Sequence, residues 1–72
     1  MSEDILFGTR ARRRLLARIY GAPDREFYLR ELVRLTGLAP RTVQVELNRL
    51  VAAELVMERR SGNRRYLRAA IR

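Results

Sequence analysis

The chain has 72 residues, 16 of them basic and 8 acidic, for a net charge of +8, and it lacks cysteine and histidine. This length predicts one small domain over residues 1–72, with residues 1–8 as a lead segment and 69–72 as a tail. The missing side chains exclude disulfides, thiolate or imidazole metal sites, and Ser-His or Cys-His catalysis. The basic balance predicts a polyanionic partner, which is DNA, RNA or an anionic membrane surface.

The first predicted helix covers Arg10 to Tyr20. Gly8 and Thr9 are expected to break or bend the chain, and Thr9 then serves as the N-cap of this helix. Its inward stripe has helical spacing and consists of Ala11, Leu15, Leu16 and Ile19. Gly21 is expected to cap the end of the helix, which Pro23 cannot continue. Arginines cover the remaining surface, as is usual for a solvated helix face.

A short strand and a second helix are predicted next. Residues 26–28 are too few for a helix, and their aromatic pair favours a brief strand. The second helix is expected from about Arg30 to Thr36, with Leu32 and Leu35 inward and Gly37 as its left-handed cap. Only two residues separate this glycine from Pro40, so two helices are joined by a short turn, which is the helix-turn-helix arrangement.

The third predicted helix lies in the stretch from Leu38 to Leu50. Its inward stripe, at steps of four and three, consists of Val43, Leu47 and Leu50. The other sides carry Arg41, Thr42, Gln44, Val45 and Asn48. Pro40 suits the first helical position, whereas Ala39 is a weak N-cap that costs about 1 kcal/mol relative to serine. Arg, Thr, Gln and Asn match the donors and acceptors of base edges in the major groove, although an ordinary surface helix would show the same pattern.

A β-hairpin is predicted after Glu54. Its strands are 55–60 and 64–68, joined by a three-residue loop, Ser61-Gly62-Asn63. The tip is surrounded by four arginines, Arg59, Arg60, Arg64 and Arg65. Because like charges in a hairpin repel, one built only for stability would avoid this cluster. Residues 69–72 are expected to form either a last helical turn or a frayed end.

The chain resembles the winged helix-turn-helix transcription regulators of the ArsR-like and MarR-like superfamily. The segments that carry this resemblance are 27–32, 36–43, 46–50, 55–56 and 59–66. They lie within residues 6–67, so the likeness covers nearly the whole chain. It is closest to the small regulators, and to the amino-terminal domains, associated with nucleotidyltransferase-type proteins. The resemblance implies a mainly α fold with a small β-hairpin, of the α+β class.

The resemblance also implies a role for individual residues. The recognition helix would be Pro40 to Ala53. It would read bases in the major groove through Arg41, Thr42, Gln44, Val45 and Asn48. The DNA backbone would be contacted by Tyr28, Arg30, Pro40 and Arg49. The wing, which would reach the adjacent minor groove, comprises Arg59, Arg60, Ser61, Gly62, Asn63, Arg64 and Arg65. Many relatives carry Arg or Lys where this chain has Val45, which offers a base only apolar contact.

These inferences predict a sequence-specific regulator that binds double-stranded DNA and acts as a repressor, not an enzyme. No cofactor, metal or membrane contact is expected, and the location would be the prokaryotic cytoplasm, on the nucleoid when bound. A homodimer is predicted because a monomer would leave Ile5-Leu6-Phe7 and Ile71 partly exposed.

Two other classes of function stay open. One is a protein-interaction module of the same fold that docks on an acidic partner. The other is RNA or RNA–protein assembly, which would need outward aromatic side chains for base stacking. Against it, Phe27, Tyr28 and Tyr66 are expected in the core or the sheet.

Overall fold

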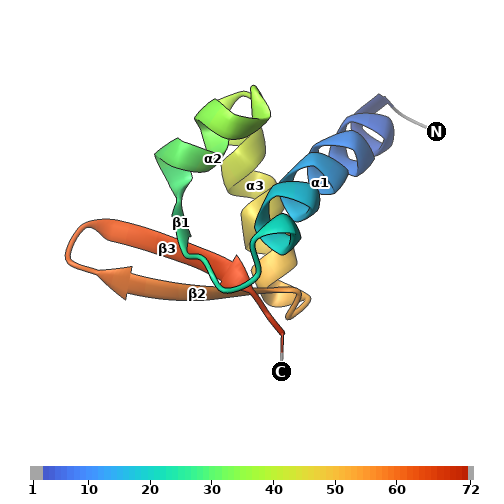
Figure 1. Cartoon of the computed structure of the whole chain (residues 1–72). Coiled ribbons are helices and arrows are strands. Elements are labelled where there is room, and N and C mark those ends of the chain that lie inside the picture. The colour runs from blue at the N-terminus through green and yellow to red at the C-terminus, as the bar shows by residue number, and fades with distance from the viewer. Residues whose placement is uncertain (1–2, 72) are drawn as a thin grey trace.

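The structure, a computed structural model, describes residues 3–71, and within residues 3–9 it describes the backbone alone. This part of the chain contains three helices and a three-stranded antiparallel sheet, an α+β arrangement. The elements are α1 (Glu3–Gly21), β1 (Phe27–Tyr28), α2 (Leu29–Thr36), α3 (Pro40–Ala52), β2 (Val56–Ser61) and β3 (Arg64–Ala69). The three helices pack together, and the β2–β3 hairpin extends away from them as an arm (Figure 1).

The core lies where the helices meet one face of the sheet. Its fully buried helical members are Leu15, Ile19, Leu32, Val43, Leu47 and Leu50. The sheet contributes Phe27, Val56 and Leu67, which are equally buried. The predicted inward stripes of the helices are therefore confirmed, except that Leu16 and Leu35 are only partly buried against this core. Burial of each large side chain contributes about 1.5–3 kcal/mol.

Helix α1 is longer than predicted, because it begins at Glu3 and continues through Gly8 and Thr9. The predicted break at Gly8, the N-cap at Thr9 and the separate lead segment are therefore wrong. An interior glycine destabilises a helix by about 1 kcal/mol relative to alanine. In a helix of 19 residues this cost is too small to end the helix at Gly8. Gly21 is the last helical residue and lacks a positive φ, so the predicted glycine cap is also wrong.

The junction between α2 and α3 follows the prediction. Gly37 has φ 70° and donates its backbone N–H to the Val33 carbonyl. The buried Thr36 hydroxyl donates to the Leu32 carbonyl at 2.6 Å and accepts from the Leu38 N–H at 3.3 Å. Ala39 precedes α3 without a side-chain cap, as expected, and the helix ends one residue earlier than predicted. The turn is thus held by backbone geometry and one threonine.

We expect Gly37→Ala to lower the free energy of unfolding by about 1–2 kcal/mol, because φ 70° brings a Cβ too close to the following carbonyl. A Cβ at this position would meet no other atom within 4 Å, so the cost is backbone strain alone. Gly21→Ala is the matched control, since its Cβ is equally unobstructed and its backbone is helical. Urea denaturation of both variants measures the difference, and equal effects would contradict this account.

The sheet has the order β1-β3-β2, so the hairpin joins neighbouring strands. Ser61 pairs with Arg64, which leaves a loop of two residues rather than the predicted three. Gly62 has φ 61° and Asn63 does not have a positive φ, a combination typical of a type II′ turn. Ala69 belongs to β3 and is buried, so the predicted tail begins later, and residues 70–71 are not helical.

Candidate nucleic-acid interface

Helix α3 turns its polar side to solvent. Arg41, Val45 and Asn48 are exposed and follow one another at steps of four and three, opposite the buried stripe. Gln44 is also exposed, whereas Thr42 is only half-buried and lies at the border of this face. The side chains that the sequence placed on the outer surface of α3 are therefore available to a ligand, with Thr42 the least accessible.

The β2–β3 hairpin lies beside this face of α3. Arg65 on β3 donates from Nη2 to the Oδ1 of Asn48 at 2.8 Å and from Nε to the Oε2 of Glu58 at 2.6 Å. The side chain of Arg65 is only 11% exposed. This contact joins two segments that are far apart in the sequence and places the hairpin next to the exposed face of α3.

A hollow of about 510 Å³ separates the start of α2 from the turn of the hairpin. It is lined by Tyr28, Leu29, Arg30, Arg34, Asn63, Arg64 and Arg65. No acidic side chain of the described residues lines it, and the α2 N-cap makes no side-chain hydrogen bond. The first N–H groups of α2 and the surrounding guanidinium groups favour an anion at this place.

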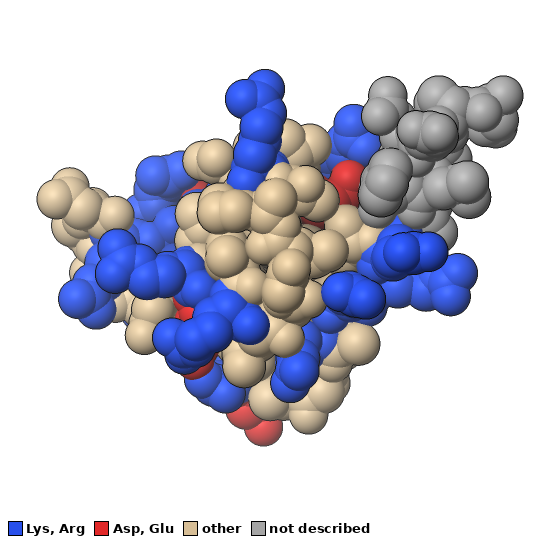
Figure 2. Space-filling model, turned by 90° about the horizontal axis from the view of Figure 1, so that it is seen from above, with Lys and Arg blue, Asp and Glu red and all other residues tan. Residues whose placement is uncertain are grey.

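Arg34 is a lining residue that the sequence analysis did not include among the candidates. The sequence could have indicated this residue, because Arg30 and Arg34 are four residues apart in one helix and therefore share a face. On the face of the molecule seen in Figure 2, arginines lie around a central area of uncharged side chains, and acidic side chains are few there. This distribution gives a surface whose potential attracts a polyanion.

The hairpin arginines are not all free charges. Arg59 lies 4.4 Å over the ring of Tyr66 and donates two hydrogen bonds to Glu26, at 2.9 and 2.8 Å. Arg60 contacts Glu58 at 3.1 Å, as Arg65 does at 2.6 Å. The like-charge repulsion expected from the sequence is therefore offset for three of the four arginines. For the fourth, Arg64, no carboxylate among the described residues lies within ion-pair distance.

The ion pair between Glu26 and Arg59 changes the acidity of both groups. The hydrogen bonds from Arg59 lower the pKa of Glu26, and the same bonds raise the pKa of Arg59. Because the pKa of Glu26 is lowered in the folded state, the pair stabilises the fold above the pKa of the unfolded state and loses this effect as the pH falls through the folded-state pKa. At neutral pH the Glu26 carboxylate is therefore ionised and remains paired with the Arg59 guanidinium.

We expect the carboxyl of Glu26 to titrate at a lower pH in the wild-type protein than in an Arg59→Gln variant. The variant removes the charged donor while leaving a side chain that can still lie on Tyr66. Carbon-detected NMR of the Glu26 carboxyl over an acid titration measures both midpoints. Identical midpoints would show that Arg59 does not hold this carboxylate in solution.

Two glutamates of the helices are buried, although carboxylates usually lie at the surface. Glu46 on α3 is 3% exposed and accepts from Arg12 of α1 at 3.2 Å and from Arg49 at 3.3 Å. Glu31 on α2 is 8% exposed and pairs with Arg25. Glu46 thus ties α1 to α3 and holds Arg49, a predicted backbone contact, beside the exposed face of α3. Pro40, another predicted contact, is exposed at the start of α3.

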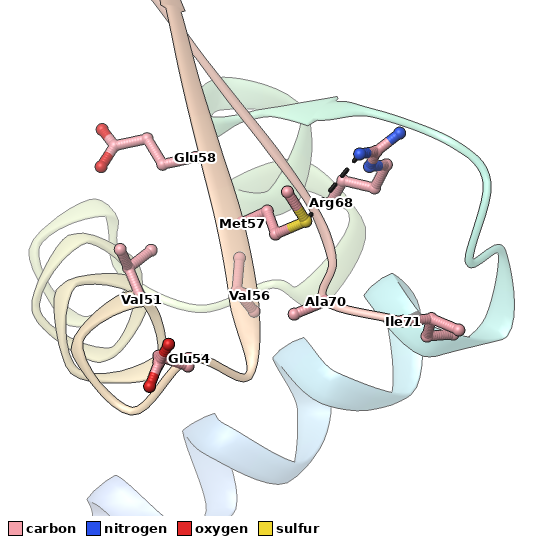
Figure 3. Close-up of a pocket in the computed structure, with 8 residues that line it drawn as sticks. All are labelled: Val51, Glu54, Val56, Met57, Glu58, Arg68, Ala70 and Ile71. Carbon is pink, nitrogen blue, oxygen red and sulfur yellow. Dashed lines mark hydrogen bonds between the residues drawn. The ribbon is translucent and has the colours of Figure 1, made fainter.

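A second surface lies at the free edge of β2. Here a hollow of about 640 Å³ is lined by Val51, Glu54, Val56, Met57, Glu58, Arg68, Ala70 and Ile71 (Figure 3). Met57 and Ile71 are 48% and 55% exposed, and Leu55 nearby is 43% exposed. The side chains of Ile5, Leu6 and Phe7, which the dimer prediction also uses, lie outside the described residues.

Over the described residues, no group of three or more metal-ligating side chains is found, and no helix is long and apolar enough to span a bilayer. No family model, curated protein or solved structure matches this chain significantly. Inferences about its function therefore depend on its own residues and their geometry.

Proposed function

We propose that this protein is a winged helix-turn-helix regulator that binds double-stranded DNA in a sequence-specific way and acts as a repressor. The observation that carries the proposal is the exposed polar side of α3, with the arginine-bearing hairpin held beside it through Asn48 and Arg65. The element order helix, strand, helix, helix, hairpin supports the same class. Repression requires only that the protein occupy a promoter.

In this proposal α3 enters the major groove and the hairpin turn reaches the neighbouring minor groove. Arg41, Gln44 and Asn48 read base edges, and Val45 contacts a thymine methyl. Thr42, at the border of the face, contributes at its edge. The DNA strand between the two grooves passes the hollow at the start of α2, where Arg30 and Arg34 meet phosphates. Arg64 enters the minor groove, whose negative potential favours a guanidinium group.

Selection of bound duplexes from a random DNA pool at physiological salt tests this function. We expect one sequence to be enriched, and Gln44→Ala to relax preference at one position while barely changing the salt dependence. Pro23→Ala, in an exposed loop away from α3 and the hairpin turn, is a control that should select the same sequence. A folded protein that selects no duplex would refute the proposal and favour an acidic protein partner.

We also propose that the protein binds as a homodimer, because Met57, Ile71 and Leu55 expose apolar surface around the hollow at β2. A two-fold dimer would read an inverted repeat with recognition helices about 34 Å apart. Sedimentation at micromolar concentration should show dimers, and Met57→Glu should shift them toward monomers. Only monomers, with and without DNA, would refute the dimer and leave the DNA-binding proposal intact.

A further inference from the structure

We infer that Arg65 is a positioning residue that fixes the side-chain amide of Asn48 so that it offers DNA hydrogen-bond donors, and that Asn48 therefore selects guanine rather than adenine. This inference rests on the proposed function and assigns a base preference to one of its residues.

The orientation of Asn48 follows from the chemistry of its partner. A guanidinium group has only donors, so the atom of Asn48 that lies 2.8 Å from Nη2 of Arg65 is the carbonyl oxygen. The amide nitrogen of Asn48 then points away from Arg65. Because Asn48 is exposed on α3, the two hydrogens of this nitrogen are available to a ligand.

Arg65 is itself held in place. Its Nε donates to Glu58 at 2.6 Å, and its side chain is 11% exposed, so its charge is balanced within the protein. Glu58 also accepts from Arg60 at 3.1 Å. The guanidinium is therefore bound at one end by a carboxylate of β2 and at the other by Asn48, and it does not extend toward solvent as a phosphate ligand would.

This arrangement changes the usual base preference of an asparagine. The common contact with adenine is bidentate and needs both the oxygen, to accept from N6, and the nitrogen, to donate to N7. In this protein the oxygen already accepts a charged hydrogen bond from Arg65, which takes one of its two lone pairs and fixes the direction of the other, so adenine N6 would have to share this oxygen with a guanidinium group. The remaining donors match guanine, which presents two acceptors, N7 and O6, in the major groove. Asn48 should therefore favour guanine over adenine by about 10-fold.

Three variants of the full chain, compared with wild type in selection from random duplexes, test this inference. Asn48→Asp keeps the bond to Arg65 but turns an acceptor to the DNA, so guanine should be replaced by cytosine, the base that presents a donor. Arg65→Met releases the amide, and the preference should shift toward adenine. Asn63→Asp makes the same charge change at the hairpin turn and should lower the binding affinity for all DNA sequences by the same factor.

Adenine at the Asn48-dependent position of the wild-type site would overturn the inference while leaving the proposed function intact. The inference would also be overturned if Arg65→Met kept the wild-type base preference, or if Asn48→Asp lowered the affinity for all DNA sequences uniformly, as Asn63→Asp should. Asn48 is exposed, so the Asn48→Asp result decides the matter even if Arg65→Met fails to fold. Absence of any duplex preference in the wild type would overturn both the inference and the proposed function.

Discussion

Raising the salt concentration from 50 to 200 mM should weaken the affinity for duplex DNA by about 100-fold per chain. Four exposed arginines of the proposed interface make no ion pair within the described residues, namely Arg30, Arg34, Arg41 and Arg64. Each arginine that neutralises the charge of one phosphate contributes about −0.9 to the slope of log K against log salt, whether it bonds the phosphate or lies in a groove beside it. Four such arginines give a slope of roughly −3.6. Fluorescence anisotropy with a labelled duplex measures this slope directly.

Two arginines of the same hairpin provide the matched comparison. Arg64→Ala should flatten the slope by about 0.9, because it removes an uncompensated charge at the turn. Arg59→Ala should leave the slope nearly unchanged, because Glu26 already neutralises that arginine through two hydrogen bonds. Glu26→Gln should release Arg59 and steepen the slope. Equal effects of the two alanine variants would show that the Glu26 pair does not persist when DNA is bound.

This comparison depends on contacts that the sequence could not reveal. Arg59 and Arg64 both lie near the same turn, and the sequence pattern does not show which of them has an acidic partner. Arg59 of β2 pairs with Glu26 because the sheet order β1-β3-β2 places the loop before β1 on the other side of β3, where Arg59 reaches it across Tyr66. Sheet order is a tertiary property, so the compensation of one charge and the freedom of the other appear only in the folded structure.

Helix positions and inward stripes were predictable because they depend on local spacing. Val43, Leu47 and Leu50 recur at helical intervals, and Gly37 is the residue that a left-handed cap favours. Glu54 shows the limit of such rules, because it has φ 62° at the end of α3, a conformation usually taken by glycine. The Leu55 N–H donates to the Leu50 carbonyl at 2.9 Å there, so backbone hydrogen bonding at the helix end holds this conformation.

The candidate site was predictable as a set of residues but not as a network. The sequence placed Asn48 and Arg65 in separate elements with separate roles, whereas the structure joins them at 2.8 Å. Glu46 carries a charge of the kind that usually lies at the surface, yet it is buried and meets Arg12 of α1. Such pairs depend on how elements pack against one another, which helical periodicity does not encode.

The proposed reading face depends on the core directly beneath it, and Leu47→Ala should therefore destabilise the fold more than Gly37→Ala does. Leu47 is fully buried in α3, and removing its side chain should cost about 2–5 kcal/mol through lost burial and the cavity left behind. A domain of this length has a total free energy of unfolding of about 4–11 kcal/mol. Circular dichroism during urea denaturation should show roughly half of that stability lost.

Val45→Ala is the control, because Val45 lies on the exposed side of the same helix and is 40% exposed. Its effect on stability should stay within about 0.5 kcal/mol, since alanine also favours the helix. The two variants should therefore separate stability from binding. Leu47→Ala should lose DNA affinity only at temperatures or urea concentrations at which part of the protein is unfolded, and stabilising osmolytes should restore it there. Val45→Ala should change only the preference for thymine, and a loss of folding in this variant would contradict the assignment of the exposed side of α3.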